Sequence, residues 1–265
     1  MTYPHRHGET KATPAIERVP NTRWTARKSV HAIPQPKVPV RKYEALALLP
    51  DGSLSEISRR APAHPIFEAG FSALARGSIL ATEEGPVAIE DLLPGIRVET
   101  RDDGFQPLLW IGTITLLPNH ATGHLQSRLF RIPVDSFGPS RPMPDLMLAP
   151  HARLLHRSPK LRDVVHKDTA LTPITAFEDG QTVIRVAPIS PVSVFHLAFR
   201  DHQILRANGL EIESYHPGED VLARLGGENL RLFMSLFPHI QSTADFGPLR
   251  APRISFEEFA NVTAA

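Results

Sequence analysis

Residues 77–100 read Gly-Ser-Ile-Leu-Ala-Thr-Glu-Glu-Gly-Pro-Val-Ala-Ile-Glu-Asp-Leu-Leu-Pro-Gly-Ile-Arg-Val-Glu-Thr. Short apolar runs alternate here with the turn pairs Gly85-Pro86 and Pro94-Gly95, a pattern typical of β-strands joined by tight turns. The pattern continues as far as residue 207, and many short strands at this spacing predict an all-β domain. The strands expected are Ile79–Thr82, Arg97–Thr100, Leu108–Ile111, Leu129–Val134, Leu146–Leu148, Arg153–His156, Val183–Ala187, Val192–Phe199 and Gln203–Ala207.

A hairpin is expected before this domain and helices after it. Pro50-Asp51-Gly52 supplies a turn between two strands within residues 43–57, because Pro presets φ and Gly accepts a positive φ. Residues 220–237 are expected to be helical, with Asn229 as an N-cap. Ser255-x-x-Glu258 is a capping-box pattern that opens a terminal helix. The expected organisation is a hairpin and linker at 43–69, the main domain at 70–218 and a helical extension at 219–265.

The first 42 residues differ in character from the rest. They hold six prolines and no hydrophobic periodicity, which predicts a disordered arm. Nine Lys and Arg stand against two Glu, an excess of seven positive charges in a chain whose net charge is +1. Only Tyr3 and Trp24 could stack on bases, so we interpret the arm as a solvated tail and do not expect nucleic-acid binding.

Composition excludes several classes of protein. The chain has 265 residues, 42% of them hydrophobic, and no Cys, so disulfides and thiolate metal sites are excluded. No apolar run approaches the ~20 residues of a membrane span, and no secretory signal is visible. A cytoplasmic protein is the default expectation, with signal-independent export left open. Nothing in the composition favours a cofactor or a metal ion, and the oligomeric state is not predicted.

A second set of motifs lies far downstream of the first. Pro-Leu-Leu-Trp-Ile-Gly (107–112) and Asp-Leu-x-Leu-Ala-Pro (145–150) follow the opening stretch, and Val-Phe-His-Leu (194–197) and Ala-Asn-Gly-Leu-Glu (207–211) close the series. In this order the motifs resemble the hedgehog/intein (Hint) domain, in the variant common in bacterial proteins. The resemblance covers residues 70–218 and implies an all-β Hint-type horseshoe of short strands.

The resemblance also implies a site. Active Hint domains use a Cys to attack the preceding carbonyl, helped by a Thr-x-x-His pair, and a thiol suits this step as both nucleophile and leaving group. Here Ala73 stands at the Cys position and Ala152 at the His position, with Ala149 in place of Thr. His151 lies one residue early, which on a strand would turn its side chain to the opposite face. His202 is the one candidate catalytic group that matches the family.

These departures lead to three hypotheses. The first is a Hint domain derived from a self-processing ancestor, inactive in cleavage, that acts as a binding or scaffold module for an unknown protein partner. The alternative is residual N-terminal self-cleavage that uses Ser72 or Ser78 with His202. The third is an unrelated activity on the same fold. Splicing is not expected, because inteins close with His-Asn and this chain has Glu213-Ser214.

Other patterns in the sequence have structural interpretations that imply no function. His120 and His124 have the spacing of a helical metal pair, but Pro118, Asn119 and Gly123 indicate a loop. We interpret His196 as a core imidazole and Trp110 as a core anchor. The stripe Leu232-Phe233-x-x-Leu236-Phe237 is expected to fold back on the β-domain.

Overall fold

The computed structural model describes Met1 and residues 39–118, 128–218 and 220–264, and the account below concerns the unit from Val38 to Ala265. The predictions made for most of the arm and for His120 and His124 lie outside the described residues. Among the described residues, no helix has the length and apolar character needed to cross a membrane.

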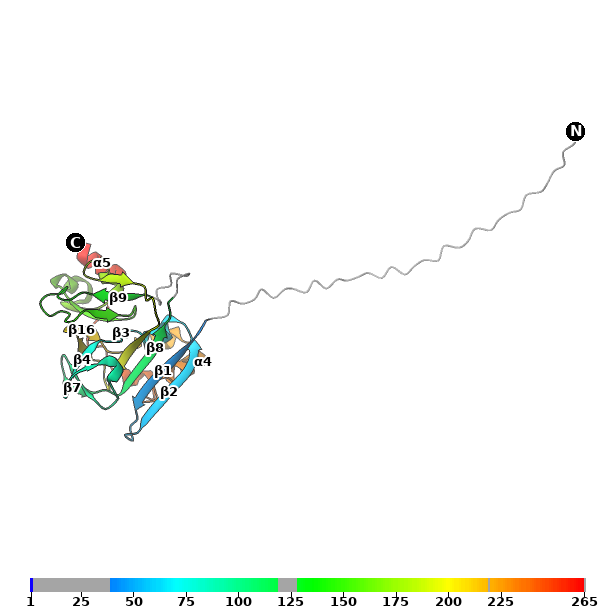
Figure 1. The fold of residues 1–265 in the computed structure, drawn as a ribbon, viewed down its shortest axis with the longest axis horizontal. Coiled ribbons are helices and arrows are strands. Elements are labelled where there is room, and N and C mark those ends of the chain that lie inside the picture. Colours follow the sequence, from blue (N-terminus) through cyan, green and yellow to red (C-terminus); the bar gives the residue numbers. More distant parts are fainter. Residues whose placement is uncertain (2–38, 119–127, 219, 265) are drawn as a thin grey trace. The chain divides into compact units, whose positions relative to one another are not determined.

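Strands dominate the described residues and form two antiparallel sheets, as the sequence predicted (Figure 1). The first sheet has the order β13 (Ile184–Val186), β9 (Leu129–Ile132), β10 (Leu146–Leu148), β3 (Leu74–Ala75), β14 (Val192–Ala198), β8 (Trp110–Leu116), β1 (Val40–Leu48) and β2 (Leu54–Pro62). The second has the order β12 (Thr169–Pro173), β11 (Arg153–Arg157), β16 (Leu210–Glu213), β15 (Ile204–Ala207), β4 (Ile79–Thr82), β6 (Arg97–Thr100) and β7 (Gly104–Pro107), with β5 (Gly85–Ala88) paired to β4.

Helices are short and lie mostly towards the C-terminus. The α-helices are α1 (Pro65–Ala69), α2 (Arg162–Val165), α3 (Val221–Arg224), α4 (Gly227–Met234) and α5 (Phe256–Ala264). The 3-10 helices are η1 (Ile89–Asp91), η3 (Pro159–Leu161), η4 (Ile174–Phe177) and η5 (Thr243–Phe246). The fold is therefore all-β with helical additions.

Alternating side chains give the first sheet two apolar faces. On β1, Tyr43, Ala45 and Ala47 belong to one core, while Leu46 packs against another. The first core also contains the buried aromatic side chains of the C-terminal segment, and the second lies towards the second sheet. On β14, residues 194–198 are all buried and contribute to both cores, which explains the nearly continuous apolar sequence of that strand.

The first core is held by aromatic side chains from distant parts of the chain. Trp110 is fully buried, and its indole N–H donates to the Leu236 carbonyl across 2.8 Å. Phe237 lies 4.7 Å from Trp110 between ring centroids and stacks on Tyr215 at 5.1 Å. Trp110 as a core anchor and the folding back of the Phe233 and Phe237 stripe are both confirmed.

The structure tests three local predictions about where strands and helices begin. The strand β1 begins at Val40, so residues 40–42, which the sequence analysis placed in the arm, are part of the sheet. Asn229 as an N-cap was wrong: α4 starts at Gly227, and the Leu230 N–H donates to the Gly226 carbonyl. The Ser255 capping box is confirmed, because Ser255 N–H donates to Glu258 and Glu258 N–H donates to the Ser255 hydroxyl.

Candidate functional site

The chain positions that correspond to the Hint nucleophile and its helper meet in space. Ala73 lies between α1 and β3, and residues 149–152 form the turn between β10 and β11. The Ala149 N–H donates to the Ala73 carbonyl across 2.8 Å, and the Ala152 N–H closes the turn by donating to the Ala149 carbonyl. Ala73 and Ala152 are both fully buried in the core that faces the second sheet. Two buried methyl groups therefore stand at the positions that the resemblance aligns with the thiol and the imidazole of active Hint domains.

The peptide bond between Ser72 and Ala73 is held on both sides by backbone groups. The Ser72 carbonyl accepts from the His151 N–H at 3.2 Å, and the Ala73 N–H donates to the Phe195 carbonyl at 3.0 Å. Such donors can stabilise charge that develops on a carbonyl oxygen. One N–H alone does not break an amide, because attack still needs a nucleophile and the leaving nitrogen still needs a proton.

The two serines proposed as substitute nucleophiles are both buried. The Ser78 hydroxyl donates to the Ala75 carbonyl across 2.7 Å, three residues back in its own turn. Ser72 itself contributes the carbonyl that the His151 N–H contacts. The Ser78 hydroxyl is therefore already engaged within its own turn.

His202 is fixed by the C-terminal segment. Its Nδ1 accepts from the Arg250 N–H at 3.0 Å, so the neutral ring carries its proton on Nε2, which lies 3.2 Å from the Glu213 carboxylate. The ring also packs edge-on against His216 at 5.3 Å. Both ring nitrogens thus lie next to groups other than the Ser72–Ala73 peptide. The role proposed for His202 with Ser72 or Ser78 stays a prediction, and these contacts do not support it.

His151 is separated from its neighbour Ala152 as the sequence analysis expected, although by a turn and not by strand alternation. Ala152 is in the apolar core, whereas the His151 ring lines a polar cavity of about 250 Å³. Burial lowers the pKa of His151 to about 4, helped by nearby His196 and Arg153. The imidazole is therefore neutral at pH 7.

This cavity, which we call the arginine cavity, collects side chains from α1, α3, β11, β14, β16 and the C-terminal segment. Its polar lining residues are His151, Arg153, His196, Glu213, Tyr215, His216, Arg224 and Arg253. His196 was interpreted as a core imidazole, and it is 4% exposed with Nδ1 2.8 Å from the Ala69 carbonyl and Nε2 3.3 Å from the Glu213 carbonyl.

Sequence reasoning missed the charged members of the cavity. The sequence pattern marks Glu213 only as a replacement for a splicing residue, and it gives no reason to single out Arg153, Tyr215 or Arg253. No local signal could have found them, because Arg153 and Arg253 lie far apart in the sequence and meet only through Glu213. The described residues contain no group of three His, Cys, Asp or Glu placed to hold a metal ion.

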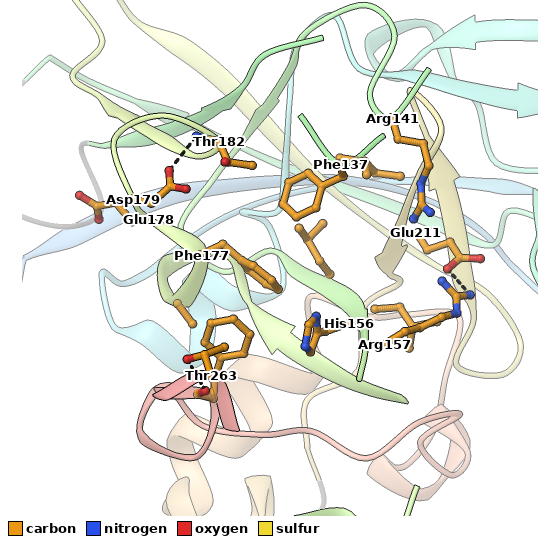
Figure 2. Close-up of a pocket in the computed structure, with 15 residues that line it drawn as sticks. Phe137, Arg141, His156, Arg157, Phe177, Glu178, Asp179, Thr182, Glu211 and Thr263 are labelled. Carbon is orange, nitrogen blue, oxygen red and sulfur yellow. Dashed lines mark hydrogen bonds and ion pairs between the residues drawn. The ribbon is translucent and has the colours of Figure 1, made fainter. Parts of the chain in front are cut away.

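A second cavity, of about 610 Å³, lies between β11, η4 and α5 (Figure 2). Phe137, Phe177 and His156 face its interior, and several of its polar groups are engaged with one another and with backbone. Arg157 pairs with Glu211 at 2.6 Å, and the Asp179 carboxylate accepts the N–H groups of residues 181–183. The residues aligned with the Hint catalytic positions are not part of its lining.

Comparison with known proteins identifies the family of this chain. The Hint domain family matches residues 72–219, which is more than half of the chain. No curated protein matches the chain. Among solved structures, the chain is similar to a GSH-linked, splice-inactive variant of the AceL NrdHF class 3 split intein, with 10% identity and a TM-score of 0.37 over 54% of this chain and 97% of that chain. On the family match, this protein belongs to the Hint domain family.

Proposed function

We propose that this chain is a Hint domain that no longer cleaves its own backbone and serves as a binding or scaffold module. The observation that carries the proposal is the pair of buried methyl groups, Ala73 and Ala152, beside the Ser72–Ala73 peptide. The ancestral reaction needs a nucleophile at the first position and a proton donor at the second, and a methyl group can perform neither step.

The segment upstream of the ancestral cleavage point provides independent support. β1 pairs with β8 as well as with β2, so residues 40–62 form part of the same sheet as β14. Glu68 on α1 is 1% exposed, and its carboxylate lies 2.7 Å from the Arg41 guanidinium. Phe71 is fully buried and packs edge-on against Trp110 at 5.1 Å between ring centroids. Scission after Ser72 would not release this segment, and a self-cleaving domain gains its effect from release.

Retention of the fold without its chemistry supports a binding role. The strands that place residues 72–73 against residues 149–152 are intact, and a polar cavity lies directly beside them. The proposal includes a protein partner whose identity is unknown. The alternative of residual self-cleavage has no supporting contact, since the Ser78 hydroxyl and the His202 ring are both engaged elsewhere.

Intact-mass spectrometry tests the loss of cleavage. The purified full chain, kept for several days at neutral pH with and without dithiothreitol or hydroxylamine, should remain a single species of 29.3 kDa. Without a thioester there is no activated bond for an added nucleophile to intercept. A fragment that ends at Phe71, Ser72 or Gly77 would overturn the proposal and favour the serine-dependent alternative.

A further inference from the structure

The arginine cavity has an excess of positive charge. Its lining contains three guanidinium groups, from Arg153, Arg224 and Arg253, and one carboxylate, from Glu213. The histidines that line it do not add to this charge at pH 7, because burial lowers the pKa of His151, His196 and His216 to about 4. The lining therefore carries two positive charges more than negative ones.

Glu213 neutralises only part of this charge. It is 3% exposed, its Oε1 accepts from the Arg253 Nε–H at 2.8 Å, and its Oε2 lies 3.7 Å from Arg153 Nε. Burial raises the pKa of this carboxyl group, but Arg253 and His202 outweigh burial and bring the pKa down to about 2. Glu213 thus holds two guanidinium groups side by side and remains ionised between them. A single carboxylate leaves one of the two positive charges without a counter-charge.

Two buried polar atoms also lack a partner within the described residues. They are the Tyr215 hydroxyl and His151 Nε2, and both residues line this cavity. Tyr215 is 3% exposed and lines the cavity together with Arg253, Glu213 and Arg224. A buried hydroxyl without a hydrogen bond is unfavourable, and such groups in native proteins usually have a water, an ion or a ligand.

We propose that the arginine cavity binds a small oxyanion, a carboxylate or a phosphate, through Arg153, Arg253 and the Tyr215 hydroxyl. Arg253 donates from Nε to Glu213 and from Nη2 to the His216 carbonyl, and Arg153 donates from Nη1 to the Leu171 and Ile254 carbonyls. Arg253 Nη1 and Arg153 Nη2 make no hydrogen bond to the described residues, so they can donate to the oxygens of the anion together with the phenol. The volume of about 250 Å³ suits a small metabolite and not a peptide. Arg224 is half exposed at the rim and lies 3.6 Å from the exposed Asp220 carboxylate, so it adds less to the attraction of an anion than the two inner arginines do.

The lining also argues against other occupants. The guanidinium groups repel a metal cation. In the cavity of Figure 2, by contrast, Arg157 is paired with the Glu211 carboxylate. The inference deepens the proposed binding role and rests on it, but it does not depend on the loss of cleavage.

Isothermal titration calorimetry on the full chain tests the proposal. The probes are sodium phosphate and sodium succinate, with succinamide as a neutral analogue of succinate and with ionic strength held constant. At least one anion is expected to bind saturably with a stoichiometry of one, and succinamide is not. Binding of phosphate alone identifies a phosphate site, and binding of succinate alone identifies a carboxylate site.

Variants connect the binding to the cavity. Tyr215→Phe removes only the hydroxyl and should weaken binding about 10-fold or more, the usual effect of losing a hydrogen bond to a charged group. Tyr43→Phe is the matched control, because the Tyr43 hydroxyl donates to the Pro62 carbonyl outside the cavity, and its affinity should equal that of the unaltered protein. Arg224→Gln provides a second test, because it removes a positive charge at the exposed rim and should also weaken anion binding. Loss of folding is not expected at this exposed position.

Each outcome decides the matter. No saturable binding of either anion at millimolar concentration, or equal affinity in the unaltered protein and in both cavity variants, would overturn the proposal. The result is separable from cleavage: an intact chain that binds neither anion refutes this inference alone, and a chain that binds an anion but fragments refutes the loss of cleavage alone.

Discussion

The backbone N–H of His151 donates to the carbonyl oxygen of Ser72 across 3.2 Å. This contact joins the turn after β10 to the peptide bond that an active Hint domain would break. It keeps the carbonyl oriented and polarised without any catalytic side chain. The proposed loss of cleavage implies that this architecture was retained after the catalytic side chains were replaced.

Restoring the lost groups should restore cleavage. Ala73→Cys alone is expected to leave the chain intact, because no side chain then protonates the leaving nitrogen. Ala73→Cys combined with Ala149→Thr and Ala152→His should give slow, dithiothreitol-dependent scission after Ser72, detected by mass spectrometry. Misplacement by ~1 Å can cost ~100-fold in rate, so long incubation is needed.

The two fragments of the repaired chain should stay together. β1 and β2 remain paired with β8 after scission, so native size exclusion should show one species while denaturing mass spectrometry shows two. A folded triple variant that never cleaves would contradict the alignment of Ala73 and Ala152 with the catalytic positions. Release of the N-terminal fragment under native conditions would contradict the integrated role of the hairpin.

Gly112 is expected to tolerate no side chain. A Cβ added there would lie 2.6 Å from Phe71 and in contact with the Trp110 ring, both of which are fixed in the core. Gly112→Ala should therefore lower the free energy of unfolding by about 2 kcal/mol or more, as overpacking does. Gly227→Ala is the control, since no atom lies within 4 Å of its Cβ position and Ala favours the helix that Gly227 begins. Urea denaturation of the two variants measures the difference, and equal stability would show that the core yields at Gly112.

Acid should destabilise the protein between pH 6.5 and pH 4. Burial lowers the pKa of His196 in the folded chain to about 4, from about 6.5 in an unfolded chain. Within that window the unfolded state binds more protons, so the stability contribution that is complete above pH 6.5 is lost as the pH falls. For one such buried imidazole the loss at pH 5 is about 2 kcal/mol.

Urea denaturation of His196→Gln at pH 7 and pH 5 measures this contribution. The variant should show a smaller change in free energy between the two pH values, because one titrating group has been removed. His166→Asn serves as the control, since His166 is exposed and Asn accepts its left-handed backbone conformation. An unchanged pH dependence in His196→Gln would show that this imidazole is not buried in its neutral form.

Limited trypsin digestion should remove residues 1–37 and stop there. Lys37 precedes β1, whereas the next basic residue, Arg41, lies within the strand and donates to the Thr115 carbonyl at 2.8 Å. We therefore expect a resistant core that begins at Val38, three residues before Arg41, because proteases need an extended and accessible backbone. A core that begins at Lys42 would show that the start of β1 opens, and protection of the whole arm would contradict its predicted disorder.

Much of the fold could be predicted from local sequence. Alternating apolar runs, Gly and Pro at turns, and the Ser255 capping box are short-range signals, because they depend on φ and ψ preferences and on which face a side chain takes. The motif order from Gly77 to Glu211 also identified the Hint resemblance. The misplaced N-cap at Asn229 shows the limit of such signals: Gly226 and the packing of Phe233 decided where α4 begins.

The sequence by itself determined that this is an all-β Hint domain without Cys, and it has Ala at two positions that the resemblance aligns with catalytic residues. Only the tertiary structure decided that His202 turns to Arg250 and Glu213, and that Arg153 and Arg253 share one buried carboxylate. The reason is physical. Strand and turn preferences act between neighbours in the chain, whereas the pairing of buried charges depends on which strands the sheet brings together.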